Sequence, residues 1–370
     1  MEKILFTAST YSHLLNFHLP YLHSFAEQGR TLHAACGGVP AFVPYLAETI
    51  HLPLEKSMSS PKNFRAMAML REKIRAEQYD LIVTHTSLAA FFTRLALAGL
   101  RERPPLINMV HGYLLDEQTP YIKRKLLLAA EQWMAPQTDL LLTMNRWDSE
   151  LASRFRLGKR VVEIPGVGVD FSRFDRAQQP GFRAAHGIPG DAFVLLYAAE
   201  FSKRKSQPVL IRAMQALPDR AVLLLAGEGA TRQTCEELVA SLGLTGRVFF
   251  PGHQRDMIPW YAAADVAVTA SRSEGLPFNV MEAMYAGLPV VASAVKGHTD
   301  LIEDGRTGLL YPYGDSGACA GQIQRLLDAP ELRRSFAEAA KSNIGHYGLD
   351  EVFPQVMEQY LSMLPSGVPV

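Results

Sequence analysis

Two acidic residues stand eight positions apart in a stretch of the chain that is also rich in turn-forming residues. Glu274 lies in S-R-S-E-G-L-P, and Glu282 follows in F-N-V-M-E-A-M-Y. Ionised carboxylates only accept hydrogen bonds, so both side chains suit hydroxyl groups such as those of a ribose and a sugar. Glutamates near a helix N-terminus can also simply complement the helix dipole. The spacing alone leaves both interpretations open.

The elements that must position these residues form a predicted βαβ unit. Residues 265–270 alternate and then run apolar, which predicts a buried strand, and residues 271–277 form a loop. A helix is predicted over residues 278–286, because Pro277 suits its first turn and Gly287 suits the position past its end. The unpaired N–H groups at the start of such a helix favour a phosphate.

The same stretch resembles the E-x7-E signature of the family 4 retaining glycosyltransferases, which have the GT-B fold. The match includes the G-x-P between the acids and the E-A-M-x-x-G-x-P-V-V-A that follows. The resemblance implies an α/β protein with two Rossmann-like domains facing across a cleft and a C-terminal helix crossing back to the first domain. It implies that Glu274 binds the transferred sugar and Glu282 the ribose. Backbone amides of the intervening loop would help to bind the donor: Gly275, Leu276, Pro277, Phe278 and Asn279.

A basic segment, A-E-F-S-K-R-K-S-Q-P, follows the predicted strand 193–198. Similar enzymes usually have G-R-x-x-x-x-K-G here, with the Arg and the Lys gripping the donor pyrophosphate. Lys205 fits the Lys position, but Glu200 stands where the Arg is usual, so Lys203 or Arg204 is expected to replace it. Fixed cations stabilise the charge that develops on a leaving nucleoside diphosphate. A solvated basic loop is the alternative interpretation.

Two further turns follow predicted strands of the second half of the chain. Gly227 and Gly229 follow the strand at 221–226, and Gly252 and His253 follow another. Gly227 and Gly229 make a tight turn at the carboxyl end of their strand, which faces the ligand crevice. In the family that this chain resembles, the loop at Gly252 and His253 flanks the nucleobase through backbone groups, so the resemblance implies that these residues lie beside the donor.

The N-terminal half begins with a predicted buried strand over residues 3–8, a polar turn over residues 9–15 and a helix from about residue 17 to residue 28. The usual dinucleotide-binding glycines do not occur in this turn. The opening resembles that of family 4 enzymes that build bacterial capsule and exopolysaccharide. Ser12 and His13 would then face the acceptor, although a surface or capping histidine is the alternative for His13.

His111 follows the predicted strand at 106–110 and precedes a glycine. The carboxyl end of a strand is a good place for a ligand contact. Similar family enzymes carry a histidine here that contacts the transferred sugar, and a merely structural histidine is the alternative.

Length and composition agree with this interpretation. A chain of 370 residues is long enough for two domains. The resemblance places an acceptor-binding domain at 1–170, a nucleotide-sugar-binding domain at 171–348 and the returning C-terminal helix at 349–370. The net charge of zero predicts no nucleic-acid partner. No cysteine spacing or D-x-D-like clamp suggests a metal, so metal-independent catalysis without a cofactor is expected.

A basic and apolar helix is predicted over residues 121–135. Lys123, Arg124 and Lys125 precede three leucines and Trp133, a combination that suits an anionic membrane surface. A core-facing helix with a solvated basic end is the alternative. No signal peptide or membrane-spanning run is predicted. We therefore expect a cytoplasmic protein that also works at the inner face of the plasma membrane.

The predicted function is the transfer of a hexose or N-acetylhexosamine from a UDP-sugar to a saccharide or polyprenyl-diphosphate-linked acceptor. Two alternatives stay open: a nucleotide-sugar epimerase of the same fold, and a degenerate homologue that binds nucleotide and assists a partner. An NAD-linked oxidoreductase is disfavoured, because neither domain carries a glycine fingerprint after its first strand.

Overall fold

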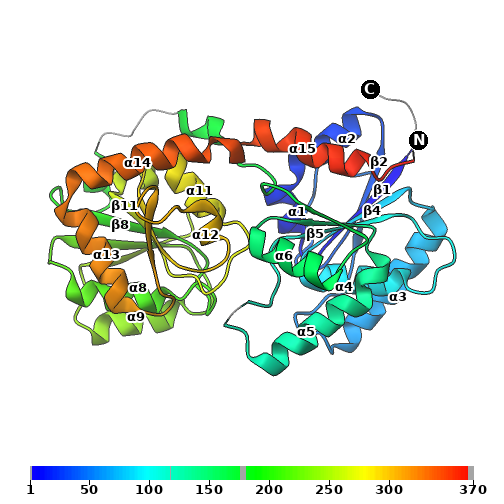
Figure 1. The fold of residues 1–370 in the computed structure, drawn as a ribbon, viewed down its shortest axis with the longest axis horizontal. Helices are drawn as coiled ribbons and strands as arrows, with labels where there is room; N and C mark the ends of the chain where they lie inside the picture. The colour runs from blue at the N-terminus through cyan, green and yellow to red at the C-terminus, as the bar shows by residue number, and fades with distance from the viewer. Residues whose placement is uncertain (1, 117, 176–180, 366–370) are drawn as a thin grey trace. The chain divides into compact units, whose positions relative to one another are not determined.

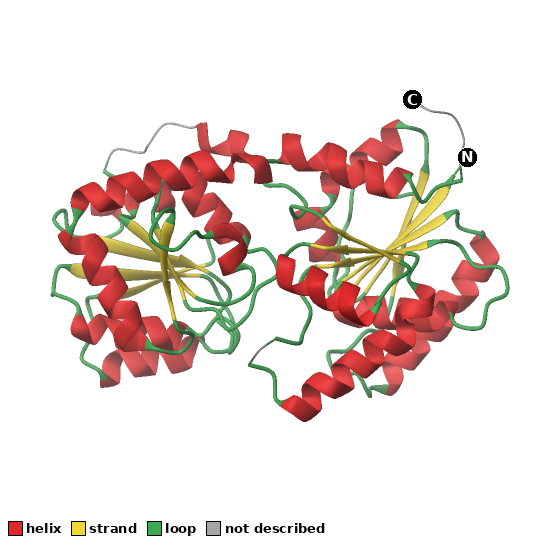
Figure 2. Cartoon of the chain, in the orientation of Figure 1, coloured by secondary structure: helices red, strands yellow, loops and turns green. Residues whose placement is uncertain are grey.

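The computed structural model describes residues 2–116, 118–175 and 181–365 of the chain (Figure 1). The chain divides into two compact units. Unit 1 is Met1–Gly168 with Asp350–Val370, and unit 2 is Val169–Leu349. Each unit is a parallel sheet with helices on both faces (Figure 2). This architecture is that of an α/β doubly wound domain.

Unit 1 contains a seven-stranded sheet in the order β3-β2-β1-β4-β5-β6-β7. The order reverses direction between β1 and β4, so this is the topological switch point, where ligands of such sheets bind. Every strand pairing in this sheet is parallel. The strands are β1 (Lys3–Ala8), β2 (Thr31–Cys36), β3 (Glu48–His51), β4 (Leu81–His85), β5 (Leu106–Val110), β6 (Leu140–Thr143) and β7 (Arg160–Glu163).

Helices connect most of these strands and cover both faces of the sheet (Figure 2). β1, β4 and β5 are almost wholly buried, as expected for a sheet covered on both sides. The helices are α1 (Tyr11–Phe17), α2 (Leu19–Glu27), α3 (Pro61–Glu77), α4 (Ser87–Leu97), α5 (Tyr121–Met134), η1 (Ala135–Gln137, a 3₁₀ turn), α6 (Arg146–Phe155) and α15 (Leu349–Leu361).

The segment after β1 differs from its prediction. The polar turn expected over residues 9–15 is largely the helix α1, and the helix expected from residue 17 begins as α2 at Leu19. His18 separates them with φ −124°. Pro20 explains the break, because proline has no N–H to continue the helix and fits the first turn of a new one. The break places His18 at the junction of the two helices.

The C-terminal helix α15 packs within unit 1. Val352, Val356 and Tyr360 have no exposed surface. The Tyr360 hydroxyl donates to Met109 Sδ of β5 at 3.7 Å, and the Phe353 ring stacks on Tyr21 of α2. Residues at the far end of the sequence therefore complete the core of the first unit.

Unit 2 contains a six-stranded sheet in the order β10-β9-β8-β11-β12-β13. Its switch point lies between β8 and β11. All of its strand pairings are parallel. The strands are β8 (Phe193–Ala198), β9 (Ala221–Ala226), β10 (Val248–Gly252), β11 (Val266–Thr269), β12 (Val290–Ser293) and β13 (Gly308–Tyr311).

The predicted βαβ unit is confirmed as β11, α11 and β12, with α11 ending one residue earlier than expected. Near the end of this unit two consecutive helices, α13 and α14, meet at Pro330, the first residue of α14. The helices of unit 2 are η2 (Phe171–Asp175), α7 (Phe182–Ala185), α8 (Gln207–Ala213), η3 (Met214–Ala216), α9 (Arg232–Ser241), α10 (Ile258–Ala263), α11 (Phe278–Tyr285), α12 (His298–Leu301), α13 (Ser316–Asp328), α14 (Pro330–Ile344) and η4 (Gly345–Tyr347).

Candidate active site

Three loops of unit 2 meet at the carboxyl ends of β8, β11 and β12. The backbone N–H of Arg272, in the loop after β11, donates to the Arg204 carbonyl in the loop after β8 at 2.8 Å. The N–H of Glu274 donates to the Lys296 carbonyl, in the loop after β12, at 3.3 Å. These strands are neighbours in the sheet, so the loops converge at the switch point of unit 2.

Glu274 forms two ion pairs with the basic segment. Lys205 Nζ lies 2.5 Å from Glu274 Oε1, and Arg204 Nη1 lies 2.6 Å from Glu274 Oε2. The Glu274 side chain is 7% exposed, that of Lys205 12% and that of Arg204 50%. Burial disfavours ionisation of the carboxyl, but the two cations outweigh it and lower the pKa of Glu274 to about 2. The carboxylate is therefore charged at neutral pH.

The sequence left open whether Lys203 or Arg204 replaces the usual arginine. Arg204 contacts Glu274 and also donates to the Ser273 carbonyl at 3.1 Å. The Lys203 side chain is exposed, and its carbonyl accepts from the Ser206 hydroxyl. Glu200 is exposed as well. Arg204 is thus the second cation that the fold brings beside Lys205.

A glycine that the sequence analysis did not single out lies directly against Glu274. Gly297 has φ 81°, and a Cβ added to it would lie 2.8 Å from Glu274 Cβ and 2.7 Å from the Gly275 carbonyl oxygen. A real Cβ does not fit at such distances, so Gly297 permits the close approach of the two loops. The signal in the sequence was a lone glycine after a strand, which is too common to identify a site.

His298 is the second unit 2 residue that the sequence analysis missed. Its ring is fully buried, with Nδ1 2.8 Å from the Ser293 carbonyl oxygen and Nε2 3.3 Å from Thr269 Oγ1. Burial lowers the pKa of His298 to about 4, although the nearby Glu274 acts in the opposite direction. His298 is therefore neutral and links the ends of β11 and β12, the strands that precede the Glu274 and Gly297 loops.

Glu282 has its own set of partners in unit 2. Arg173 Nη2 donates to Glu282 Oε1 at 2.7 Å, and the Tyr261 hydroxyl donates to Glu282 Oε2 at 3.0 Å. Burial raises the pKa of Glu282 despite these two hydrogen bonds, which act to lower it. Arg173 lies far from Glu282 in the sequence, and no motif indicated this pair.

The loop between the two glutamates leads into α11. Leu276 is buried, Pro277 is the residue before the helix and Phe278 is its first residue. The Asn279 carbonyl accepts from the Tyr261 hydroxyl at 3.3 Å. Gly275 lies against Gly297, as described above. The predicted strand–loop–helix corner therefore exists, with Glu274 before the helix and Glu282 within it.

The predicted glycine turns pack against the loop after β8. A Cβ on Gly227 would lie 2.1 Å from the Ala199 carbonyl oxygen, and one on Gly229 would lie 2.3 Å from the Phe201 carbonyl oxygen. Both have positive φ, so glycine is required there. Gly252 ends β10 with φ 78°, and His253 after it is exposed. Gly227 and Gly229 thus allow the loop after β9 to pack against the loop that carries the cations.

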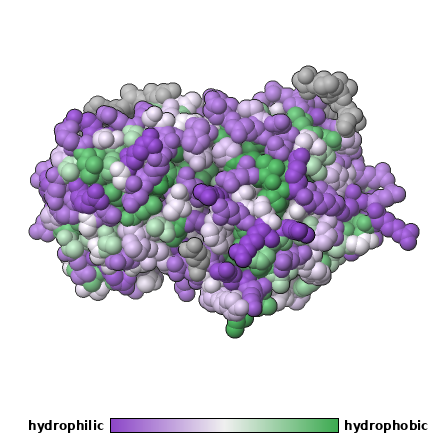
Figure 3. Space-filling model, in the orientation of Figure 1, coloured by the Kyte–Doolittle hydropathy of each residue, from purple (hydrophilic) through white to green (hydrophobic). Residues whose placement is uncertain are grey.

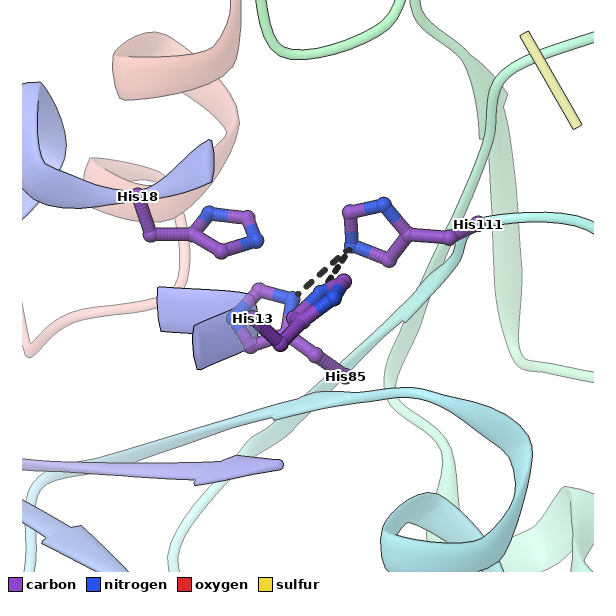
Figure 4. Close-up of side chains that lie close together, drawn as sticks. All are labelled: His13, His18, His85 and His111. Carbon is purple, nitrogen blue, oxygen red and sulfur yellow. Dashed lines mark hydrogen bonds between the residues drawn. The ribbon is translucent and has the colours of Figure 1, made fainter. Parts of the chain in front are cut away.

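The predicted residues of unit 1 lie at its own switch point, and two histidines join them. His13 is in α1 after β1, His85 ends β4, His111 follows β5, and His18 lies at the α1–α2 junction. Figure 4 shows the four rings directed toward one another. His111 Nε2 lies 3.2 Å from His13 Nε2 and 3.3 Å from His85 Nδ1. Ser12, by contrast, is exposed and contacts Thr10.

His18 and His85 were not predicted as site residues. Both are fully buried, whereas His13 and His111 are partly exposed. Burial lowers the pKa of His13 to about 4 and holds the pKa values of His18, His85 and His111 well below the usual range, with the neighbouring imidazoles adding to the effect in these three. All four rings are therefore neutral at physiological pH.

α5 exposes large apolar side chains beside its basic residues. Tyr121, Ile122, Leu126 and Trp133 are 64–74% exposed. Lys123, Arg124 and Lys125 are exposed between them. Figure 3 shows hydrophobic surface at the lower tip of this helix next to hydrophilic surface. Among the described residues, no helix combines the length and apolarity needed to cross a bilayer.

These features define a class of protein. Two Rossmann-like units, one of which carries paired cations and carboxylates at its switch point, are the arrangement of a nucleotide-sugar transferase of the GT-B type. Residues 178–343 match the family described as Glycosyl transferases group 1, and residues 21–173 match Glycosyltransferase Family 4.

Individual relatives agree with the family matches. The chain is 34% identical over 348 residues to EpsD of Bacillus subtilis, a protein named as a glycosyltransferase, and the match covers 92% of this chain and 91% of EpsD. It is 31% identical over 295 residues to D-inositol 3-phosphate glycosyltransferase 2 of Catenulispora acidiphila, covering 73% of this chain and 67% of that protein. The chain therefore belongs to glycosyltransferase family 4.

Solved structures show the same fold. HepE of Anabaena, solved with UDP and glucose, superposes with a TM-score of 0.81 at 21% identity, covering 98% of this chain and 100% of HepE. Sucrose-phosphate synthase from Thermosynechococcus elongatus gives a TM-score of 0.81 at 22% identity, covering 98% and 99%. The predicted GT-B fold is confirmed. The protein is a glycosyltransferase of the EC 2.4 class that transfers a sugar from a nucleotide sugar.

Proposed function

We propose that the protein is a retaining transferase that moves a hexose or N-acetylhexosamine from a UDP-sugar to a saccharide or polyprenyl-diphosphate-linked acceptor in cell-surface polysaccharide synthesis. Unit 2 would hold the donor and unit 1 the acceptor. The observation that carries this proposal is the Glu274 carboxylate held by both Lys205 and Arg204 at the switch point of unit 2.

The two cations are suited to a diphosphate. Bond cleavage at the anomeric carbon increases the negative charge on the leaving nucleoside diphosphate, and fixed cations stabilise that charge without reorganising. Lys205 is largely buried, so its charge is weakly screened, whereas half-exposed Arg204 can adjust to a ligand. Because these side chains supply the positive charge, we expect transfer to need no metal at the diphosphate.

Glu274 would change partners when the donor binds. A diphosphate competes with the carboxylate for the same two cations, because each cation is attracted to the larger negative charge. The carboxylate would then accept hydrogen bonds from hydroxyls of the transferred sugar. Gly297 and the buried His298 would hold the loop in position during this exchange.

Glu282 would bind the ribose of the donor. Its carboxylate is held by Arg173 and Tyr261, so its orientation is fixed before a ligand arrives. Backbone N–H groups at the start of α11, near Gly275 and Asn279, would add donors toward the phosphates. Gly227, Gly229 and Gly252 would allow close backbone approach, and the backbone near His253 would flank the base.

The reaction we propose is a front-side displacement with an oxocarbenium-like transition state. The bond from the anomeric carbon to the phosphate oxygen breaks, and the acceptor oxygen bonds to that carbon on the same face. The departing phosphate accepts the acceptor's proton. His111 of unit 1 would contact the transferred sugar, and Ser12 and His13 would face the acceptor.

UDP is our first choice of nucleotide because HepE, which has the same fold, was solved in complex with UDP-glucose. The acceptor class comes from the N-terminal segment, which resembles that of capsule and exopolysaccharide enzymes. We expect the protein to act in the cytoplasm, at the inner face of the plasma membrane.

The test is direct. Purified protein is screened with UDP-, GDP- and ADP-sugars by thermal shift, and the stabilising donor is then incubated with saccharide and lipid-linked acceptors. We expect stabilisation by a UDP-sugar and a product whose anomeric configuration, read by NMR, matches that of the donor. Stabilisation by UDP-sugars without transfer to any acceptor would favour a nucleotide-binding partner protein. Formation of an epimeric nucleotide sugar from the donor in the absence of acceptor would favour the epimerase.

A second function is favoured by the surface of α5. We propose that this helix docks on anionic membrane surfaces, with the exposed Ile122, Leu126 and Trp133 entering the interface and Lys123 to Lys125 meeting the headgroups. Docking would bring unit 1 to a lipid-linked acceptor.

A further inference from the structure

The four histidines at the switch point of unit 1 form a compact set of potential metal ligands. One ring nitrogen from each of His13, His18, His85 and His111 can be chosen so that all lie within 4.8 Å of one another. They come from three segments that follow or end β1, β4 and β5. The adjacent strands therefore hold them on a rigid frame, as a preformed site requires.

Two of the separations already match tetrahedral coordination. Zinc binds imidazole nitrogen at about 2.0–2.1 Å, so neighbouring ligands of a tetrahedral zinc lie about 3.3–3.4 Å apart. His111 Nε2 lies 3.2 Å from His13 Nε2 and 3.3 Å from His85 Nδ1. The remaining pairs would have to close from at most 4.8 Å to this distance.

Hydrogen bonding among the rings accounts poorly for the cluster. A neutral imidazole nitrogen offers either one proton or one lone pair, so His111 Nε2 cannot make two full hydrogen bonds to its two neighbours. Among the described residues, both nitrogens of His18 and Nε2 of His85 have no hydrogen-bond partner, and both residues are fully buried. Unpartnered buried polar atoms are costly, and a bound cation would give at least one of them a partner.

We propose that these four histidines bind one divalent transition-metal ion, with Zn²⁺ as the best fit. Imidazole suits zinc, copper, nickel and cobalt, whereas magnesium and calcium prefer oxygen ligands. Four imidazoles would occupy all four tetrahedral positions, which is the pattern of a closed, structural site. Neutral imidazole is the form that binds metal.

The ion would join the α1–α2 junction to the ends of β4 and β5. Coordination through Nε2 would leave the proton of His111 on Nδ1. The ring would then have a fixed tautomer and could still donate a hydrogen bond to a sugar oxygen. The metal site does not depend on the proposed transfer reaction, since its ligands and its test are independent of the donor.

The experiment measures binding of the metal itself. Protein freed of any histidine tag is stripped with a chelator, dialysed and titrated with Zn²⁺ by calorimetry, and Co²⁺ is used to record the visible spectrum. We expect one Zn²⁺ per chain, a raised Tm and the intense visible bands of tetrahedral Co²⁺. Absence of stoichiometric binding, or an octahedral Co²⁺ spectrum, would overturn the proposal.

Variants make the test specific. His18→Leu removes a ligand and two unpartnered buried nitrogens, so the metal-free protein should remain folded by circular dichroism. Its Zn²⁺ affinity should fall by more than the roughly 10–100-fold that loss of an outer-shell partner costs. His85→Gln should likewise remain folded and show a similar loss of Zn²⁺ affinity. His33→Gln is the matched control, because His33 is a buried histidine of β2 that bonds to Tyr79. Unchanged binding in both folded ligand variants would also refute the site.

Discussion

The ammonium of Lys205 lies 2.5 Å from a carboxylate oxygen of Glu274, although the two residues are 69 positions apart in the sequence. Arg204 contacts the other oxygen of the same carboxylate. The Glu274 carboxylate thus occupies the position beside Lys205 and Arg204 where, as we propose, the donor's phosphates bind.

Replacing Lys205 with alanine should abolish most of the transfer activity. The leaving diphosphate would lose a fixed, largely buried cation, and loss of one such electrostatic contact lowers kcat by about 10²–10³-fold. Steady-state kinetics with the preferred donor measure the effect. Lys341→Ala is the control, because Lys341 is an exposed lysine of α14 in the same unit. Full activity of folded Lys205→Ala would refute the assignment of this residue.

Glu274→Gln should change how stability depends on pH. A carboxyl whose pKa is lowered on folding stabilises the fold above its unfolded value, and this contribution disappears as the pH falls toward the folded value. For Glu274 these values are 4.5 and about 2. The variant should therefore be less stable than wild type at pH 7, and the difference should shrink between about pH 4.5 and pH 2. Urea unfolding at several pH values measures it, and a constant difference would contradict the argument.

Glu282→Ala should weaken donor binding more than it slows the chemical step. A hydrogen bond to a charged group contributes about 1.5–3 kcal/mol, so KM should rise roughly 10–100-fold. Burial raises the pKa of Glu282. As the pH is lowered, wild-type Glu282 should therefore lose its charge, and kcat/KM should start to decrease, at a higher pH than is usual for a glutamate. The variant should lack this pH dependence.

Glu303→Ala serves as the control for this variant, because Glu303 is an exposed glutamate of unit 2 paired with Arg306. Its KM should equal that of wild type. If Glu282→Ala lowers kcat with KM unchanged, the ribose assignment is wrong.

Gly297→Ala should reduce activity while the protein remains folded. The added Cβ meets the Glu274 side chain and the Gly275 carbonyl, so the loop that carries Glu274 must shift. Gly314→Ala is a matched control, because Gly314 has a similar φ of 83° and no atom near the added Cβ. Both variants should lose about 1–2 kcal/mol of stability from the positive φ, but only Gly297→Ala should lose transfer. Equal activities would show that the close approach has no functional role.

Replacing Lys123, Arg124 and Lys125 together with alanine should abolish binding to anionic vesicles. Each basic residue near such a surface contributes about 1 kcal/mol, so affinity should fall roughly 100-fold at low salt. Co-sedimentation with phosphatidylserine-containing vesicles measures it. The control removes the same charge by replacing Arg325, Arg334 and Lys341, which are exposed on α13 and α14. If the wild-type protein does not bind these vesicles, the membrane proposal is wrong.

Much of the fold followed from local patterns. The alternating and apolar runs predicted β11 and β12, and the proline and glycine at either end of α11 predicted that helix to within one residue. The prediction failed after β1, where Ser9 to Leu15 reads as a polar turn but α1 forms. There the buried Tyr11 and Leu14 pack against the core, and this tertiary contact outweighs the weak local signal.

The sequence by itself determined the family and the strand–helix corner, and it identified Glu274, Glu282 and Lys205 as candidate site residues. Each of these features is encoded by residues close together in the chain. Only the tertiary structure decided that Arg204, and not Lys203, joins Lys205, that Gly297 lies against Glu274, and that His13 meets His111 from 98 positions away. The physical reason is that the order of strands in a sheet, set by packing of the whole domain, determines which strand-end loops become neighbours.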